Sequence, residues 1–450
     1  MIVLKFGGTS VGSAENIKKV AKIVIAEKES NIVVLSAMSG VTNTLQNISN
    51  LLSQKKIDEA QLEMFNLNQK YNKVVQGLFD SNDHFVKASL MINYHNEVLL
   101  PLLEIEFSEK VEKVILAQGE LVSTNLFQLY MEELEESSNL ISALDFMTID
   151  DNHEPDTERI KESIAKVISK HPRSKTLITQ GFICKNTSGE IDNLKRGGSD
   201  YTASIIGAAV EASQIQLWSD ISGMHNNDPR FVDQTFSIEE ISFDEAAELA
   251  YFGAKILHPQ SIIPAKEKNI PVLLKNTFKP EAKGTLIHNG ANPQGSDVNI
   301  RAIAAKDNIT AIKIKSYRML MAYGFLKKIF EIFEQNQTSI DMITTSEVAV
   351  SLTIDDTSKL TEIIQELEGF GSIEVDSDLS IICIAGNIAQ NKKGVTAAIF
   401  NCLTDIPIRM ISYGGSNYNL SFLVKASDKI AVLNLLNKGL FTSEATVLVN

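Results

Sequence analysis

The first 44 residues contain the pattern that most restricts the fold, two short apolar runs separated by an amphipathic segment. Residues 2–8, IVLKFGG, and residues 31–40, NIVVLSAMSG, are typical of strands, whereas residues 13–30 repeat apolar side chains at helical spacing. Strands joined through a helix pack as parallel neighbours. The opening therefore predicts an α/β fold with a parallel sheet.

Length, charge and cysteine usage restrict the class of protein. A chain of 450 residues is too long for one core, so we expect two or three domains. Its net charge of −14 argues against a nucleic-acid partner. No apolar run approaches the ~20 residues of a membrane span, and the N-terminal residues enter a strand directly, so we expect neither a membrane anchor nor a targeting segment. Cys184, Cys383 and Cys402 form no CxxC pair, which favours a reducing cytoplasm without disulfides or structural zinc.

Changes in texture along the chain predict three domains. Residues 45–135 are polar and helix-rich, and the α/β pattern then resumes up to a stretch rich in Gly, Pro, Asn and Asp. We place the first boundary there, so that residues 1–298 form one domain. After it, the order strand, helix, strand, strand, helix occurs twice, which predicts two ferredoxin-like units over residues 299–380 and 381–450. The last strand of the second unit is either residues 445–449 or residues 300–305.

The turn KFGGTSVGS, residues 5–13, is the first candidate site. Gly7 and Gly8 let the backbone approach a ligand, and the turn delivers N–H groups at the start of a helix, which suits phosphate. Lys5 precedes the glycines inside an apolar strand and would leave the sheet near its carboxyl edge, where open α/β sheets bind ligands. The alternative is a tight strand-to-helix turn with a solvated lysine.

A second glycine turn, NLKRGGSDYTAS, spans residues 193–204 and carries Arg196, Ser199 and Asp200 around two glycines. An arginine beside so small a backbone suits a carboxylate or a phosphate. The alternative is a capping turn, with Ser199 or Asp200 at the N-cap of the following helix.

Three further stretches carry polar residues in structured surroundings. SDISGMHNNDPR follows a strand with Ser219 and Asp220 and ends on Arg230, and FGAKILHP carries Lys255. Each alone is more typical of a loop or a helix end than of a site. Glu120 lies on an otherwise apolar and small-residue helix, either as a buried carboxylate with an internal partner or as the acceptor of a substrate ammonium group.

Together these stretches resemble the aspartate kinase family. KFGGTSV, SAMSGVTN, GELVST, RGGSDYTA, SDISGMHNNDPR and FGAKILHP occur in the family's order and spacing, and the C-terminal repeat resembles its ACT regulatory domains. The likeness covers essentially the whole chain. It implies the amino acid kinase fold, an α/β/α sandwich with a mostly parallel sheet. It also implies transfer of the γ-phosphoryl group of ATP to the side-chain carboxylate of aspartate, the first step toward lysine, threonine and methionine.

The same resemblance implies roles for individual residues. Lys5 would contact the transferring phosphoryl group and Asp200 would orient it, while Glu120 would bind the ammonium group of aspartate and Arg196 its α-carboxylate. The further aspartate contacts would be Thr42, Gly197 and Ser199, and the further ATP contacts would be Gly7 and Gly8 through backbone donors, with Ser219, Asp220, Arg230 and Lys255. Mg²⁺ is expected mainly on the ATP phosphates, with no dedicated metal ligands of the protein.

The stretch from residue 319 to residue 355 resembles the lysine-sensing unit of lysine-inhibited aspartate kinases, most clearly in YGFL and SIDMITTSE. Asp341 and Glu347 would supply anions for the two ammonium groups, and the helix start at Gly324, Phe325 and Leu326 would bind the carboxylate. Ser339, Ile340, Thr345 and Ser346 would complete the site between two chains, which predicts a homodimer or a dimer of dimers. The alternative is that Asp341 caps a strand and Glu347 is solvated, and threonine is the rival effector.

Two other functions remain open at the sequence level. Relatives of the same fold phosphorylate glutamate, N-acetylglutamate, UMP or carbamate, although they do not typically combine the KFGGTSV opening with two ACT units. The second open function is that of a catalytically inactive amino-acid sensor. The joint presence of Lys5, Arg196 and Asp200 argues against it.

Overall fold

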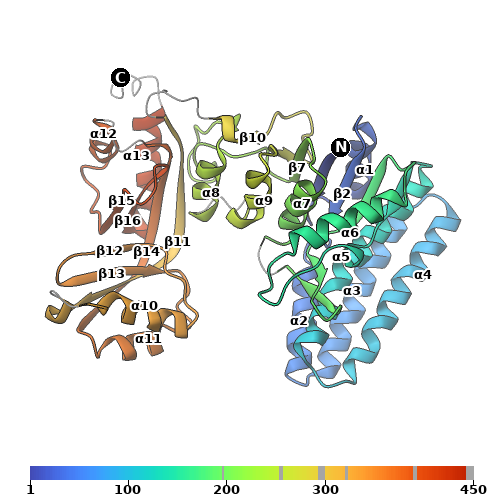
Figure 1. The fold of residues 1–450 in the computed structure, drawn as a ribbon, viewed down its shortest axis with the longest axis horizontal. Helices are drawn as coiled ribbons and strands as arrows, with labels where there is room; N and C mark the ends of the chain where they lie inside the picture. Colours follow the sequence, from blue (N-terminus) through green and yellow to red (C-terminus); the bar gives the residue numbers. More distant parts are fainter. Residues whose placement is uncertain (195–196, 253–256, 292–298, 320–322, 389–392, 442–450) are drawn as a thin grey trace. The chain divides into compact units, whose positions relative to one another are not determined.

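The chain divides into two compact units (Figure 1). The computed structural model describes residues 1–194, 197–252, 257–291, 299–319, 323–388 and 393–441. The first unit comprises Met1–Met224, Glu239–Phe243 and Ile256–Ala291, and the second comprises His225–Ile238, Asp244–Lys255 and Asn292–Asn450.

The first unit is built on an eight-stranded sheet in the order β3-β4-β2-β1-β7-β9-β10-β8. The strands are β3 Ser138–Leu140, β4 Thr176–Gln180, β2 Asn31–Leu35, β1 Ile2–Phe6, β7 Gln214–Ser219, β9 Val272–Asn276, β10 Thr285–Ile287 and β8 Glu240–Ile241. Pairing is parallel from β3 through β9, and β10 is antiparallel to β9. The predicted mostly parallel sheet is therefore confirmed. A separate hairpin pairs β5 Ile183–Lys185 with β6 Ile191–Asn193.

Helices cover both faces of this sheet. They are α1 Ala14–Ala26, α2 Val41–Ser53, α3 Ile57–Leu78, α4 Asn82–Leu99, α5 Glu109–Glu133, α6 Thr157–Ser169, α7 Gly198–Ala209 and α9 Ile263–Glu267. Leu4 and Phe6 of β1 share one buried apolar cluster with α1 through α5. Val3 faces the other way, toward α7, where a side chain at Gly207 would meet Ile215 and Val3. Successive residues of β1 thus face different helix layers, as in an α/β/α sandwich.

The predicted helix-rich segment at residues 45–135 is formed by α2 through α5, which Figure 1 shows as long helices packed together. Apolar side chains of all four helices belong to the cluster that also buries the sheet, including Leu45, Met64, Ile92 and Leu126. The segment is therefore part of the first unit's core.

The second unit contains a six-stranded sheet in the order β12-β13-β11-β14-β16-β15. The strands are β12 Ile343–Thr345, β13 Ala349–Ile354, β11 Asn299–Lys315, β14 Ser372–Asn387, β16 Asn419–Lys425 and β15 Met410–Tyr413. Its helices are α8 Phe243–Tyr251, α10 Phe325–Gln335, α11 Leu360–Leu367, α12 Val395–Asn401 and α13 Lys429–Phe441. The two predicted ferredoxin-like units are confirmed, each with its own apolar core.

The two ferredoxin-like units share β11 and β14, the longest strands of the sheet. Residues 311–315 of β11 pair with residues 372–376 of β14 in one ferredoxin-like unit, and residues 299–306 pair with residues 381–387 in the other. The register shifts between these stretches, where Asn308 and Asp378 have positive φ, as at a β-bulge.

The units are therefore not consecutive along the chain, as the sequence order suggested. Residues 299–306 supply the strand that completes the second ferredoxin-like unit, which is one of the two alternatives left open. The first ferredoxin-like unit is inserted after this strand. The rival strand at residues 445–449 lies outside the described residues. The predicted division at residues 380 and 381 falls inside β14, a single strand.

Candidate functional site

Lys5 and Asp200 form an ion pair at the carboxyl edge of the first unit's sheet. The ammonium of Lys5 lies 2.5 Å from a carboxylate oxygen of Asp200, and the two side chains are 12% and 19% exposed. Lys5 follows Leu4 on β1, so it points to the α7 side of the sheet while Leu4 is buried on the other. The structure thus brings together residues that lie 195 positions apart in the sequence, and the pair fixes an ammonium group where ligands bind in this type of sheet.

The second glycine turn places Asp200 in the first turn of α7. Gly197, with φ of 71°, is the N-cap residue, and the helix begins at Gly198. The alternative that Ser199 or Asp200 caps this helix is therefore wrong, because both lie inside it. Ser199 is buried, and a side chain at Gly181, after β4, would lie 2.3 Å from it. Arg196 lies outside the described residues.

The first glycine turn is held by neighbouring strands. The N–H of Gly7 donates to the carbonyl of Trp218 at 3.1 Å, so the expected role of Gly7 as a phosphate donor is corrected, since that hydrogen is already bound. Gly8 lies so close to the loop after β2 that a Cβ atom would be 2.8 Å from the carbonyl oxygen of Ala37. Only glycine fits there without a shift of the backbone.

Glu120 points into the same region from α5. It is 3% exposed, and one oxygen accepts the N–H of Ala37 at 3.1 Å. The other oxygen is buried and has no hydrogen-bond partner in the described structure, and the same holds for the hydroxyl of Tyr71. Burial raises the pKa of Glu120 to about 7, and burial together with the charge of Glu120 raises the pKa of Tyr71. A buried carboxylate with a free oxygen is a suitable acceptor for a ligand's ammonium group.

Thr42 is the second residue of α2 and is exposed, two positions after Gly40, whose φ is 78°. The ammonium of Lys70 reaches this loop from α3 and donates to the carbonyl of Ser39 at 2.5 Å. Burial lowers the pKa of Lys70. Sequence reasoning missed this lysine because nothing around it in the helix-rich segment distinguishes it from a solvated one.

Ser219 and Asp220 lie where β7 ends, at the same edge of the sheet. The carbonyl of Ser219 accepts the N–H of Thr277, and the carbonyl of Asp220 accepts the side-chain amide of Asn276 at 3.2 Å. The hydroxyl of Thr277 in turn lies 2.7 Å from that of Ser10 in the first glycine turn. Asn276 and Thr277, which sequence reasoning missed, therefore tie the end of β7 to the glycine turn.

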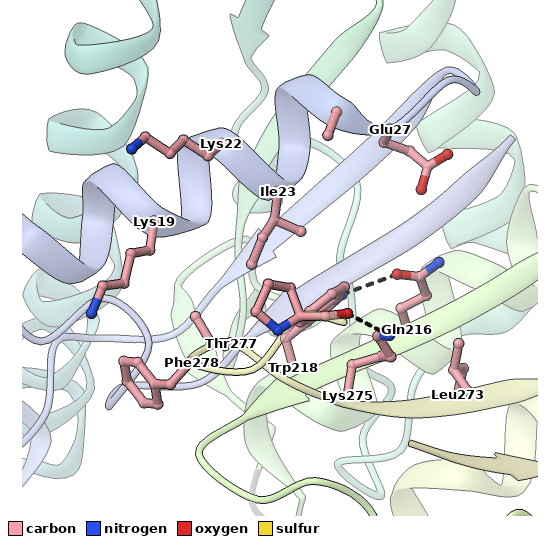
Figure 2. A pocket seen from close by; sticks show the side chains of 12 residues that line it. Lys19, Lys22, Ile23, Glu27, Gln216, Trp218, Leu273, Lys275, Thr277 and Phe278 are labelled. Atoms are coloured by element: carbon pink, nitrogen blue, oxygen red, sulfur yellow. Dashed lines mark hydrogen bonds between the residues drawn. The ribbon is translucent and has the colours of Figure 1, made fainter. Parts of the chain in front are cut away.

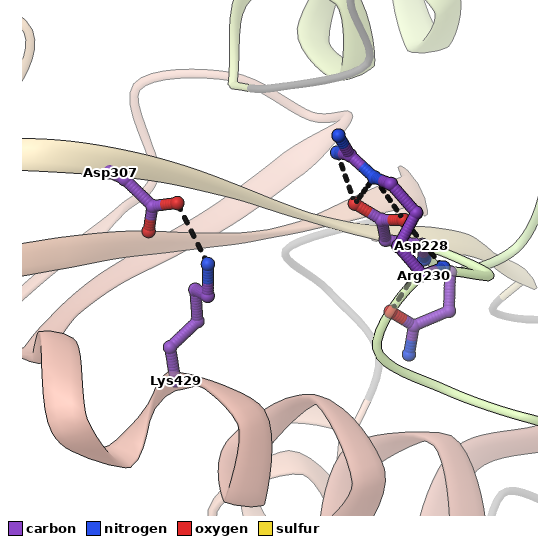
Figure 3. Close-up of polar contacts among 5 residues, drawn as sticks. Asp228, Arg230, Asp307 and Lys429 are labelled. Atoms are coloured by element: carbon purple, nitrogen blue, oxygen red, sulfur yellow. Dashed lines mark hydrogen bonds and ion pairs between the residues drawn. The ribbon is translucent and has the colours of Figure 1, made fainter.

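The two remaining predicted ATP residues belong to the second unit. Arg230 forms a bidentate pair with Asp228 in Figure 3, with nitrogen–oxygen distances of 2.6 Å and 2.9 Å, and its side chain is 73% exposed. Lys255 lies outside the described residues.

A pocket of about 600 Å³ opens on the opposite face of the sheet from Lys5 (Figure 2). Its lining includes Trp218, which stacks on Phe6, and Lys19, whose ammonium lies 5.3 Å from the ring centre of Phe278. Lys275 at its rim donates to two backbone carbonyls. Because Phe6 and Lys5 face opposite sides of β1, this pocket is separate from the Lys5 site.

The predicted effector residues lie in the second unit, at the start of α10 and in the stretch from Ser339 through β12 to Glu347. Gly324, with φ of 79°, is the N-cap residue, and Phe325 begins the helix. One carboxylate oxygen of Asp341 lies 2.6 Å from the ammonium of Lys306, and the other is buried without a hydrogen-bond partner in the described structure; the first oxygen is the one bound by Lys306. The same oxygen accepts the hydroxyl of Tyr251 at 2.9 Å. The alternative that Asp341 caps a strand does not describe this arrangement.

The other polar effector residues are open to solvent. Ser339, Thr345, Ser346 and Glu347 are exposed, with Thr345 at the end of β12, an edge strand of the sheet. Leu326 and Ile340 are half-buried against the core of the same ferredoxin-like unit. The predicted effector residues therefore include one buried, paired carboxylate and several side chains that face solvent.

The described residues include neither a metal-binding cluster nor a membrane-spanning helix. No group of three or more His, Cys, Asp and Glu side chains there is placed to hold a metal ion. No helix in that part of the chain is both long and apolar enough to cross a bilayer.

Comparison with known proteins gives consistent matches. Residues 1–276 match the amino acid kinase family and residues 382–440 match the ACT domain. The lysine-sensitive aspartokinase 3 of Escherichia coli is 34% identical over 98% of this chain and 99% of its own, and the chloroplastic aspartokinase 1 of Arabidopsis thaliana is 33% identical over 98% of this chain and 80% of its own. The crystal structure of E. coli aspartokinase III with aspartate and ADP superposes with a TM-score of 0.85 at 33% identity, covering 98% of this chain and all of that chain. The complex of that enzyme with lysine and aspartate gives 0.83.

The raised pKa of Glu120 predicts how the stability of the protein depends on pH. Between the ordinary value of 4.5 and about 7, the folded state keeps a proton that the unfolded chain has released, so stability falls as the pH rises through this window. We expect Glu120→Gln to unfold at higher urea concentration than the wild type at pH 8, with a smaller difference at pH 5. Glu97→Gln, at an exposed carboxylate of α4, is the control. An equal difference at both pH values would contradict the raised pKa.

Proposed function

The chain belongs to the aspartokinases, within the amino acid kinase family, and we propose which of its residues transfer the phosphoryl group and how lysine regulates it. It phosphorylates the side-chain carboxylate of aspartate with ATP, and feedback inhibition by lysine acts through its ACT units. The observation that carries the site assignment is the Lys5–Asp200 pair, together with the buried carboxylate of Glu120, one oxygen of which has no hydrogen-bond partner in the described structure.

The chemistry explains why a lysine on a strand suffices. A carboxylate with a pKa near 4 is already an anion at pH 7, so the nucleophile needs no general base. The obstacle is repulsion between this anion and the phosphates of ATP, and catalysis consists of positioning and charge neutralisation. The ammonium of Lys5, held at the sheet edge by Asp200, would lie between the two anions and stabilise the charge that develops on the transferring group.

Aspartate would bind on the Glu120 side of this pair. Its ammonium group would pair with the free oxygen of Glu120, which would remove the cost of leaving that oxygen buried and unsatisfied. Arg196 would bind the α-carboxylate, with Thr42, Gly197 and Ser199 lining the pocket. The position of Ser199 and Gly197 at the start of α7, beside Asp200, supports this assignment.

ATP would bind at the end of β7. Ser219 and Asp220 lie at that strand end, beside the glycine turn with Gly8, and Arg230 and Lys255 would add positive charge. Mg²⁺, when bound, would neutralise part of the phosphate charge, and we assign it mainly to the phosphate oxygens. Asp200 is paired with Lys5 and is not assigned to the metal.

Lysine inhibition would act at the residues around Asp341, Glu347 and the start of α10. Because β12 is an edge strand, two chains could pair there, and we propose a homodimer or a dimer of dimers that completes this site. Lys306 binds one oxygen of Asp341, and the other oxygen, buried without a partner in the described structure, would accept an effector ammonium group. A cytoplasmic location belongs to the same proposal, and the free thiols of Cys184, Cys383 and Cys402 support it.

The first test concerns chemistry. We expect Lys5→Met to fold like the wild type, as judged by circular dichroism, and to lose about a hundred-fold or more in kcat, the usual effect of removing one stabilising group from a transition state. A coupled assay of aspartate-dependent ADP release measures this. Lys22→Met, at an exposed lysine of α1, is the matched control. Turnover near the wild-type value would refute the role of Lys5 and revive the inactive-sensor alternative.

The second test separates the two substrates. Glu120→Gln keeps an acceptor for Ala37 but removes the charge, so we expect the KM for aspartate to rise far more than the KM for ATP. Arg230→Ala should do the reverse. Steady-state kinetics with each substrate varied in turn decides. If both variants changed both constants alike, the division into an aspartate side and an ATP side would be wrong.

The third test concerns regulation. We expect Glu347→Ala and Thr345→Ile to raise the lysine concentration for half-inhibition by about five-fold or more without abolishing catalysis, because allosteric coupling is typically worth this much. Glu368→Ala, at an exposed carboxylate that follows α11, is the control. Inhibition by threonine and not by lysine would overturn the effector assignment and leave the kinase assignment intact.

A further inference from the structure

The segment of residues 225–238 carries Arg230. It is anchored in the six-stranded sheet of the second unit and its helices, which together form the two ferredoxin-like units and are called the regulatory fold below. Val232 is 3% exposed and belongs to the apolar core formed by β14, β16 and α13. Phe236 meets Phe441, at the end of α13, edge to face, with ring centroids 5.7 Å apart. Although this segment lies between β7 and β8 in the sequence, its packing partners come from β14, β16 and α13, the last helix in the described part of the chain.

Asn437 of α13 is the polar centre of this contact. Its side-chain oxygen accepts the amide groups of Asn226 at 3.0 Å and Asn227 at 3.4 Å, and its own amide donates to the carbonyl of Gln234 at 3.0 Å. Asn226, Asn227 and Asn437 are 0%, 2% and 6% exposed. One buried side chain thus holds the segment on both sides of Arg230.

The bonds continue from Asn437 to Arg230. Asn227 also donates to the carbonyl of Leu433, and its side-chain oxygen accepts the N–H of Asp228 at 2.9 Å. Asp228 in turn accepts the backbone N–H of Arg230 at 2.9 Å and forms the bidentate pair with its guanidinium, which Figure 3 shows beside the separate Asp307–Lys429 pair. The direction of an exposed guanidinium is therefore set by a buried residue of the regulatory fold.

We propose that Asn437 positions Arg230 for ATP, so that the second ferredoxin-like unit sets the affinity of the enzyme for nucleotide. The proposal rests on the proposed role of Arg230 in ATP binding. A long exposed side chain loses conformational entropy when it binds a phosphate, and a segment that already holds it in place reduces that cost. Asn437 is a positioning residue, because it acts through Asp228 and Arg230.

The competing interpretation is that Asn437 only stabilises the fold of the second unit. Stability alone would lower the amount of active enzyme and leave both Michaelis constants unchanged. A positioning role predicts a change confined to ATP. The test is therefore the KM for each substrate, measured on protein whose folding has been checked by circular dichroism.

We expect Asn437→Ala to raise the KM for ATP about ten-fold, the effect of losing roughly one or two buried hydrogen bonds on an equilibrium, with the KM for aspartate and kcat near wild type. Leu435→Ala, at an exposed position of the same helix, should change neither constant. In the double variant with Arg230→Ala, the KM for ATP should equal that of Arg230→Ala alone, because residues that act through one another are not additive.

Asn434→Ala keeps the test open if Asn437→Ala does not fold. Asn434 is exposed on α13 and donates to the carbonyl of Phe231, the residue after Arg230, at 3.1 Å, so a smaller rise in the KM for ATP is expected. If Arg230→Ala raises the KM for ATP but the α13 variants do not, or if the double variant is additive, Asn437 does not position Arg230 and the kinase assignment stands. If Arg230→Ala itself leaves the KM for ATP unchanged, the proposed role of Arg230 fails, and this inference fails with it.

Discussion

The ion pair between Lys5 and Asp200 is the contact on which the arrangement of the catalytic unit depends. It joins the first strand of the chain to the first turn of α7, and it requires three conditions together. Lys5 must face the α7 side of β1, Gly197 must turn the chain at positive φ so that α7 begins beside it, and the sheet must be parallel, so that strand ends meet at one edge. The ion pair with Asp200 also restricts the conformations of the Lys5 side chain. The ammonium group of Lys5 therefore stays where a phosphate of ATP would meet the carboxylate of aspartate.

The same edge leaves polar atoms unsatisfied. One oxygen of Glu120 and the hydroxyl of Tyr71 are buried without partners in the described structure, which costs folding free energy. Such a cost is expected at a site that binds a charged ligand, because the groups that pair with the ligand must lack partners within the protein before the ligand binds. Lys70 belongs to the same pattern, since burial lowers its pKa while its ammonium donates to the carbonyl of Ser39, in the loop before α2.

The sequence predicts the edge of the sheet at which Lys5 and Asp200 meet well because its signals are local. The signals are Lys5 inside an apolar strand, two glycine turns, and strand ends followed by polar residues. Each depends only on residues that are close in the sequence, and the parallel sheet follows from the strand–helix–strand order. What the sequence could not provide is tertiary. The N–H of Gly7 is taken by Trp218, more than 200 positions away, and Lys70 lies in an ordinary helix. The insertion of one ferredoxin-like unit into the other was only one of two options, because β11 and β14 each have a bulge in the middle and each half has the length of an ordinary strand.

The regulatory fold is tied to two segments that come from within the kinase part of the sequence. Residues 225–238, with Arg230, are held by Asn437, and α8, which ends four positions before Lys255, is held by the bond from Tyr251 to Asp341. An effector can inhibit only if it binds one conformation of the enzyme better than another. Lys306 and Tyr251 both bind one carboxylate oxygen of Asp341, and the other oxygen is buried without a hydrogen-bond partner in the described structure. An ammonium group bound to that oxygen would add a positive charge beside Lys306 and would act on one of the contacts of α8. The Asn437 contact has no charged group for an effector to compete with, so it would keep residues 225–238 in place whether or not the contact of Tyr251 changes.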